Sequence, residues 1–122
     1  MDYYERFIMY SLKTCASRSE LANRNSRQKH NRAMTSLYKL MRGKMYAEPD
    51  RCAEAALRLM AHSDARVRMH AAAYCLQAEV HQERARALLY QMSREEPEGL
   101  IQFNAKMSAM CCIPFSKQPD PT

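Results

Sequence analysis

Hydrophobic residues recur along this chain at intervals of three and four positions, which is the spacing of an amphipathic helix. The clearest case is segment 63–76, where Ser63 is expected to cap the helix. Three consecutive alanines, 71–73, leave little bulk on one side, so a neighbouring helix can approach closely. The segment is therefore predicted to be the inner helix of a helical hairpin. Its inward face is expected to hold Val67, Ala71, Ala72, Cys75 and Leu76, with Arg66, Arg68 and His70 off that face.

The same spacing predicts five more helices, with expected bounds 2–16, 20–42, 49–62, 79–96 and 100–112. In the second of these, the polar stretch 23–31 leaves two possibilities open: a helix largely in water, or a break between two short helices. Gly43 is expected to end that helix, and Pro49 to occupy the first position of the next. The inward face of the first helix is expected to hold Tyr4, Ile8, Leu12 and Cys15, and to be widened by Tyr3, Phe7 and Tyr10.

Two of the predicted hairpins repeat the same inward residues. The positions that match at a spacing of 34 residues are Val67 with Ile101, Ala71 with Ala105, and Leu76 with Met110. At a spacing of 32 residues, the matches are Leu57 with Leu89 and Met60 with Met92. Two-helix units at this period are typical of an α-solenoid. The predicted fold is all-α: a short right-handed α-solenoid of about six helices, forming one domain over residues 1–113, with a mobile proline-rich tail at 114–122.

Composition supports helices and a reducing compartment. The chain has 122 residues, only two glycines and few β-branched side chains, which disfavours a sheet. Its five cysteines form an odd set without a Cys-x-x-Cys pair, so reduced thiols are expected rather than disulfides. The first residues, MDYYERF, carry acids where a signal peptide needs basic residues. A cytoplasmic protein without a membrane partner is expected.

Positive charge gathers in the first part of the chain. Residues 1–46 hold ten Lys or Arg against three Asp or Glu, whereas residues 47–122 hold nine against ten. Between Arg18 and Lys44 the only acid is Glu20. Such a segment attracts polyanions or an acidic protein surface, and a solvated face without a specific partner is the alternative.

The pattern of reactive side chains does not predict an active site. The four histidines and five cysteines lack the spacing of a zinc site. Cys75 and His70 lie five positions apart and are not expected to face each other, and Cys52 has a favourable position in a first helical turn but no identifiable base. No catalytic residue, metal ligand or cofactor is therefore expected.

The pattern Asp64-x-x-Val67-Arg68-x-x-Ala71-Ala72-x-x-x-Leu76 resembles the second helix of a HEAT-like repeat. Over roughly residues 20–112, the chain resembles a family of small bacterial HEAT-like proteins of unknown function, some of which are immunity proteins of polymorphic or contact-dependent toxin systems. The segments that carry this resemblance are 31–33, 37–40 and 103–107. The resemblance implies that Arg68 braces an acid of the same or the next helical unit, such as Asp64.

The expected function is therefore non-enzymatic protein binding. In its most specific form, which rests on the resemblance, the protein binds one cognate toxin, for which a nuclease is one candidate class, and occludes its active site. The candidate partner-binding residues are Arg24, Arg27, Arg32, Arg66, His70 and Tyr74, with a place at the rim of the core as the alternative for Tyr74. The alternative function is nucleic-acid binding through the basic segment 18–44, whose cations are Arg18, Arg24, Arg27, Lys29, Arg32, Lys39, Arg42 and Lys44.

Overall fold

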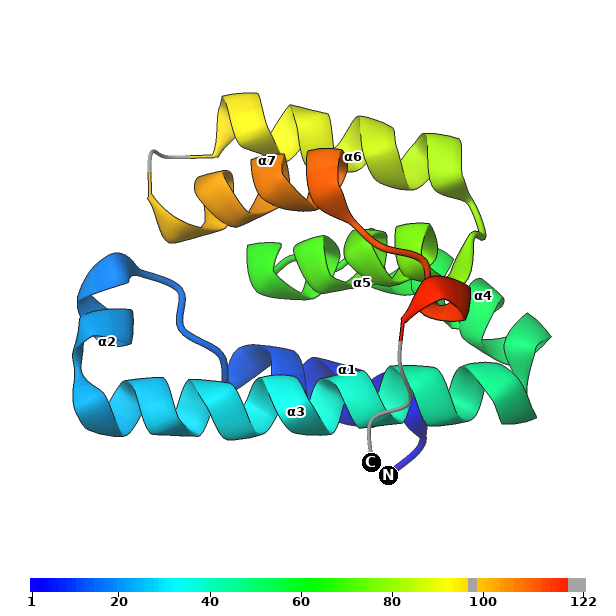
Figure 1. The fold of residues 1–122 in the computed structure, drawn as a ribbon, viewed down its shortest axis with the longest axis horizontal. Coiled ribbons are helices and arrows are strands. Elements are labelled where there is room, and N and C mark those ends of the chain that lie inside the picture. Colours follow the sequence, from blue (N-terminus) through cyan, green and yellow to red (C-terminus); the bar gives the residue numbers. More distant parts are fainter. Residues whose placement is uncertain (97–98, 119–122) are drawn as a thin grey trace.

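A computed structural model describes residues 1–96 and 99–118, and in this part of the chain it consists of α-helices and one short 3-10 turn (Figure 1). The all-α prediction is confirmed, and the solenoid arrangement within that class stays a prediction. The predicted corner at Pro97 and the last four residues of the tail lie outside the described residues. The elements are α1 (Tyr3–Leu12), α2 (Arg18–Ala22), α3 (Arg24–Ala47), α4 (Pro49–Leu59), α5 (Ala65–Ala78), α6 (Gln82–Glu95), α7 (Leu100–Cys111) and η1 (Phe115–Lys117).

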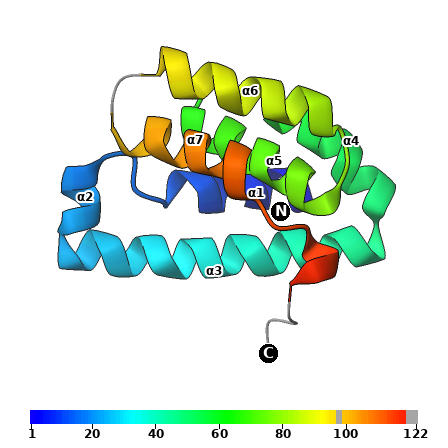
Figure 2. The ribbon, with the colours of Figure 1, turned by 45° about the horizontal axis from the view of Figure 1, so that its top comes forward.

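The helices lie in three tiers, with α1 and α3 in the first, α4 and α5 in the middle, and α6 and α7 in the third (Figure 1). Helix α3 runs along one side of the molecule, with α2 at one end and α4 at the other (Figure 2). Helix α5 packs against α1, α4, α6, α7 and η1. The prediction that segment 63–76 is an inner helix is therefore confirmed. None of the described helices combines the length and apolar character that a lipid bilayer crossing requires.

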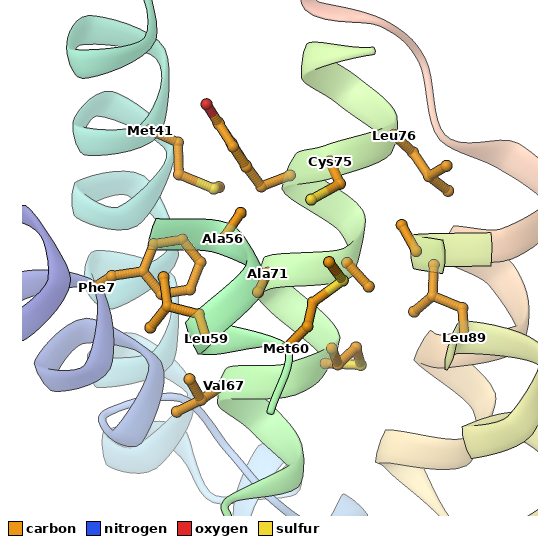
Figure 3. Close-up of a cluster of buried hydrophobic side chains, with 14 of the residues drawn as sticks. Phe7, Met41, Ala56, Leu59, Met60, Val67, Ala71, Cys75, Leu76 and Leu89 are labelled. Atoms are coloured by element: carbon orange, nitrogen blue, oxygen red, sulfur yellow. The ribbon is translucent and has the colours of Figure 1, made fainter. Parts of the chain in front are cut away.

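The core is built around α5. All five residues expected on its inward face are buried, and Ala71 and Ala72 have no exposed surface. Phe7 from α1 and Leu89 from α6 approach α5 from opposite flanks (Figure 3). The helix begins one residue later than expected, because the side chain of Asp64, not Ser63, accepts the Arg66 backbone N–H at 2.8 Å.

Helix α1 ends at Leu12, and its buried face is centred on Phe7, which was expected only to widen that face. Phe7 and Ser11 are fully buried, whereas Leu12 is exposed. The hydroxyl of Ser11 lies 3.0 Å from Nδ1 of His70, so a polar contact fixes the centre of this face. Hydrophobic spacing cannot reveal a buried serine that is paired with a buried histidine.

The basic segment contains both a break and a long helix. The break falls at Asn23, whose side chain accepts the Ser26 N–H at 3.0 Å and so caps α3. Helix α3 continues through Gly43 to Ala47, so the expected end at Gly43 was wrong. The helix ends because Pro49 disfavours helical dihedrals at the preceding residue, and Glu48 has φ −142° and ψ 64°.

The matched repeat fails at Met110. This residue is 63% exposed, and Ala109 is buried in its place. A residue five positions after Ala105 lies about 140° around the helix from it, outside a narrow buried face. Its counterpart Leu76 is buried because other elements surround α5, whereas α7 has an open outer side.

The segment after α7 packs onto the molecule instead of extending as a mobile tail. Phe115 in η1 is 1% exposed, and its ring contacts the rings of Tyr38 and Tyr74 at centroid distances of 5.7 and 6.2 Å. Gln118 accepts a hydrogen bond from the Tyr38 hydroxyl. The expectation of a mobile tail is therefore wrong for residues 114–118.

Candidate protein-binding groove

A cavity of about 370 Å³ lies between the first tier and the two tiers above it. Helices α3 and α5 each contribute four side chains, α7 contributes three and Cys112 follows it, and the loop after α1 closes one end. The lining residues are Thr14, Cys15, His30, Met34, Tyr38, Met41, Met69, His70, Ala73, Gln77, Asn104, Met107, Ser108 and Cys112.

A second hollow, of about 320 Å³, continues this cavity along the C-terminal half of α7. Gln77, Met107, Ser108 and Cys112 line both, and Cys111, Ile113 and Gln118 complete the second. We call the two hollows together the α7 groove. It joins a partly enclosed interior to the open surface of the last helix.

The α7 groove carries no Asp, Glu, Lys or Arg among its lining residues. Its two histidines are held neutral at pH 7. Burial lowers the pKa of His70 to about 4, with a smaller contribution from His30, and burial also lowers the pKa of His30. His30 accepts the Cys15 N–H at Nδ1 at a distance of 2.9 Å, which places its proton on Nε2. The groove is therefore an uncharged surface.

Four methionines give the groove its apolar character: Met34, Met41, Met69 and Met107. Methionine is unbranched and has several rotatable bonds, so it adapts its shape to a bound group. Methionine-rich surfaces are typical of sites that accommodate apolar side chains of a protein partner.

Three polar side chains line the groove without a hydrogen-bond partner among the described residues. They are Gln77 on α5 and Asn104 and Ser108 on α7, all half-buried. Asn104 and Ser108 are four positions apart and lie on the same side of α7. These groups can orient the backbone or polar side chains of a bound segment, while the methionines contact its apolar side chains.

The outer side of α7 carries an exposed apolar stripe beside the groove. Phe103, Met107 and Met110 follow one another at helical spacing, and Ile113 extends the line beyond the helix. Phe103 is 50% exposed and Ile113 57%. Exposed apolar residues that are contiguous, rather than scattered, mark interaction sites. We call these four residues the α7 stripe.

Sequence reasoning missed the α7 stripe because it assigned Met110 to the core. A signal was present, since Phe103, Met107 and Met110 repeat at the spacing of a second apolar face opposite Ala105. A helix with two apolar faces is either buried on both sides or presents one of them to a partner.

The predicted site residues fall into separate regions. Arg24, Arg27 and Arg32 are exposed on α3. Arg27 also donates to the carbonyls of Leu21 and Ala22 at the end of α2, which holds the short helix against α3. The structure therefore leaves a basic surface on α3 and does not bring it together with the three candidates on α5.

Arg66 and Arg68 serve the fold. Arg66 forms two hydrogen bonds to the Asp64 carboxylate and donates to the carbonyls of Leu12 and Thr14 at 3.1 and 3.0 Å. It thereby satisfies one carbonyl at the end of α1 and one just after it. Arg68 does brace an acid, but that acid is Glu96 and not Asp64. The donors of Arg66 are engaged within the chain, and its assignment to a partner surface stays a prediction.

His70 and Tyr74 belong to the interior. Tyr74 is 1% exposed and packs against Phe115, so its place is the core and not a partner surface. His70 lies at the floor of the α7 groove, with its ring held by Ser11. Its side chain is too deeply buried to be the outward contact that was expected.

Thiol chemistry is not favoured at the buried cysteines. Burial raises the pKa of Cys75 to about 12 and also raises those of Cys15, Cys52 and Cys112. For Cys52, the effect of burial on the pKa is larger than that of its position in the first turn of a helix, which was expected to lower the pKa. A neutral thiol is a weak nucleophile and a poor metal ligand. Among the described residues, no group of three His, Cys, Asp or Glu is placed to hold a metal ion.

Comparisons with protein-family models, curated proteins and solved structures found no match to this chain.

Proposed function

We propose that the protein binds another protein through the α7 groove and the α7 stripe, and that it acts by binding and not by catalysis. The observation that carries this proposal is the continuity of an uncharged methionine-lined groove with exposed apolar side chains on the last helix. Met107 belongs to both and stands at the centre of the surface. Apolar anchors that enter a pocket surrounded by weaker contacts are the usual source of binding energy.

The partner segment we propose is an amphipathic helix. The three polar side chains of the groove that lack a partner among the described residues, Gln77, Asn104 and Ser108, can bind polar groups at the edge of this segment. Its apolar face would fill the groove as in other helix-in-groove complexes.

The toxin-inhibitor form of this proposal rests on the resemblance described above. In that form, the amphipathic segment belongs to a toxin encoded beside this gene, and one copy of the protein blocks one toxin by covering its active cleft. Because shape and charge complementarity would hold the toxin, the inhibition would require no catalytic activity from this protein.

The test is co-purification of the tagged protein with the product of the adjacent gene, followed by size-exclusion chromatography. We expect a one-to-one complex. The Phe103→Asp variant should weaken it at least tenfold, because a carboxylate would be placed on the apolar stripe. The matched control is Tyr90→Asp, since Tyr90 is 40% exposed on α6, away from the groove. No complex, or equal loss in both variants, would contradict the proposal.

A further inference from the structure

A second surface pocket lies on the other side of α3, between this helix and the end of α1. Its volume is about 290 Å³, and its lining residues are Tyr10, Lys13, Lys29, Arg32, Ala33 and Ser36. Three of the six are cations and none is an acid. The structure adds Lys13, which follows α1 directly, to a basic surface that was expected from segment 18–44 alone.

The three cations have no counter-charge among residues 1–96 and 99–118. Among the described residues, the side chains of Lys13, Lys29 and Arg32 form no ion pair or hydrogen bond, and neither do the hydroxyls of Tyr10 and Ser36. Like charges placed around one pocket repel each other, so an anion held between them would be stabilised. Ammonium, guanidinium and hydroxyl donors around a single hollow suit the oxygens of a phosphate group.

The outer side of α3 extends this chemistry well beyond one pocket. Between positions 24 and 39, every exposed residue of the helix is basic or an uncharged polar residue: Arg24, Asn25, Arg27, Gln28, Lys29, Asn31, Arg32, Thr35 and Lys39. At about 1.5 Å per residue this stretch is roughly 24 Å long. This stretch belongs to α3, which lies on the far side of the molecule from α6 (Figures 1 and 2). Its length favours a polyanion over a single ion.

We propose that this face of α3 binds the phosphodiester backbone of a nucleic acid, with one phosphate seated in the pocket of Lys13, Lys29 and Arg32. The absence of exposed apolar side chains between positions 24 and 39 of α3 favours a nucleic acid over an acidic protein, because a protein interface needs an apolar centre. Phosphates need only charge and donors, and the intervening Gln28, Asn31 and Thr35 are of the kind that contact phosphate and sugar. Binding of this type does not depend on base sequence.

The expected strength follows from the release of counterions. With about four phosphates neutralised, the logarithm of affinity for a single strand should fall with the logarithm of salt at a slope near −3, or about 50-fold between 50 and 200 mM salt. Removing two of the contacts should reduce that slope by about 1.5.

The experiment is fluorescence anisotropy with labelled 20-nucleotide single strands of RNA and DNA at both salt concentrations. We expect the Lys29→Glu/Arg32→Glu variant to lose at least tenfold in affinity and part of its salt slope. The control is Arg86→Glu, which changes an exposed cation on α6. Thermal unfolding of each variant, followed by circular dichroism, ensures that the compared proteins are folded.

Three outcomes would overturn the proposal. The first is that neither strand binds at 50 mM salt, and the second is that Arg86→Glu loses as much affinity for each charge changed as the double variant does. The third is that a poly-glutamate peptide binds more tightly than either strand. The Phe103→Asp variant separates this site from the α7 groove. It should bind both strands as the unchanged protein does, so failure at one surface does not imply failure at the other.

Discussion

The guanidinium of Arg68 lies 2.9 Å from the carboxylate of Glu96, which joins the start of α5 to the end of α6. The same guanidinium donates to the carbonyls of His62 and Ser63. Arg66, two positions earlier, reaches the opposite way to the end of α1. These two arginines therefore connect the middle tier to both of its neighbours at one end of the molecule.

Arg68→Ala should lower the free energy of unfolding by about 1–3 kcal/mol, because charge-assisted hydrogen bonds to a partly buried group are lost. Glu96→Gln should cost less, since Arg68 retains its two carbonyl acceptors. Urea denaturation measures both, with Arg86→Ala as the exposed control on α6. An Arg68→Ala variant as stable as this control would mean that the connection contributes nothing to the fold.

Ala71→Leu tests the close approach of helices to α5. Ala71 has no exposed surface, and its site lies within the core shown in Figure 3. Additional methyl groups must displace packed neighbours, which costs about 1–3 kcal/mol of unfolding free energy. Ala87→Leu is the matched control, because Ala87 is exposed on α6. If thermal unfolding midpoints of the two variants agreed, the space around Ala71 would be larger than the structure indicates.

Sequence periodicity predicted α5 well and the outer helices less well, for a physical reason. Other elements surround α5, so nearly any apolar residue on it becomes buried, as Leu76 does. For α7, one apolar face meets the core and the other meets solvent. Hydrophobicity alone does not distinguish Ala109, which is buried, from Met110, which is not.

The polar interior was the part of the site that spacing could not reveal. His70 is buried because Ser11, 59 positions earlier, supplies its hydrogen-bond partner. Arg66 likewise finds its acceptors at Leu12 and Thr14. Such pairings depend on which distant segments come into contact in the fold. These contacts cannot be inferred from a single sequence alone. The basic surface on α3 was predictable because charge depends on composition.

Acidification should destabilise the protein through His70. The pKa of His70 in the folded state is about 4, below the ordinary value of 6.5. Between pH 4 and pH 6.5, His70 is therefore protonated in the unfolded chain but not in the folded protein. Stability from this group is complete above pH 6.5 and is lost as pH falls toward 4, by about 3 kcal/mol in total at about 1.4 kcal/mol per pH unit. The lowered pKa of His30 acts in the same direction, whereas the lowered pKa of Asp64 acts only at still lower pH.

Unfolding free energies measured in urea at pH 7 and pH 4.5 check this dependence. The His70→Gln variant should be less stable at pH 7 but should show a shallower decline on acidification. His81→Gln, which removes an exposed histidine, is the control. An unchanged decline in the His70→Gln variant would assign the acid sensitivity to other groups.

Substitutions at Phe115 and Phe103 distinguish the role of the C-terminal segment in stability from the role of the α7 stripe in binding. Phe115 is 1% exposed against Tyr38 and Tyr74, whereas Phe103 is half exposed on α7. Phe115→Ala should lower the free energy of unfolding by about 3–4 kcal/mol because it leaves a cavity. Phe103→Ala should leave stability within about 0.5 kcal/mol and weaken partner binding by tenfold or more. Urea denaturation and the co-purification assay measure the two effects separately. If Phe103→Ala instead destabilised the fold as much as Phe115→Ala, the α7 stripe would be part of the core and could not serve as a docking surface.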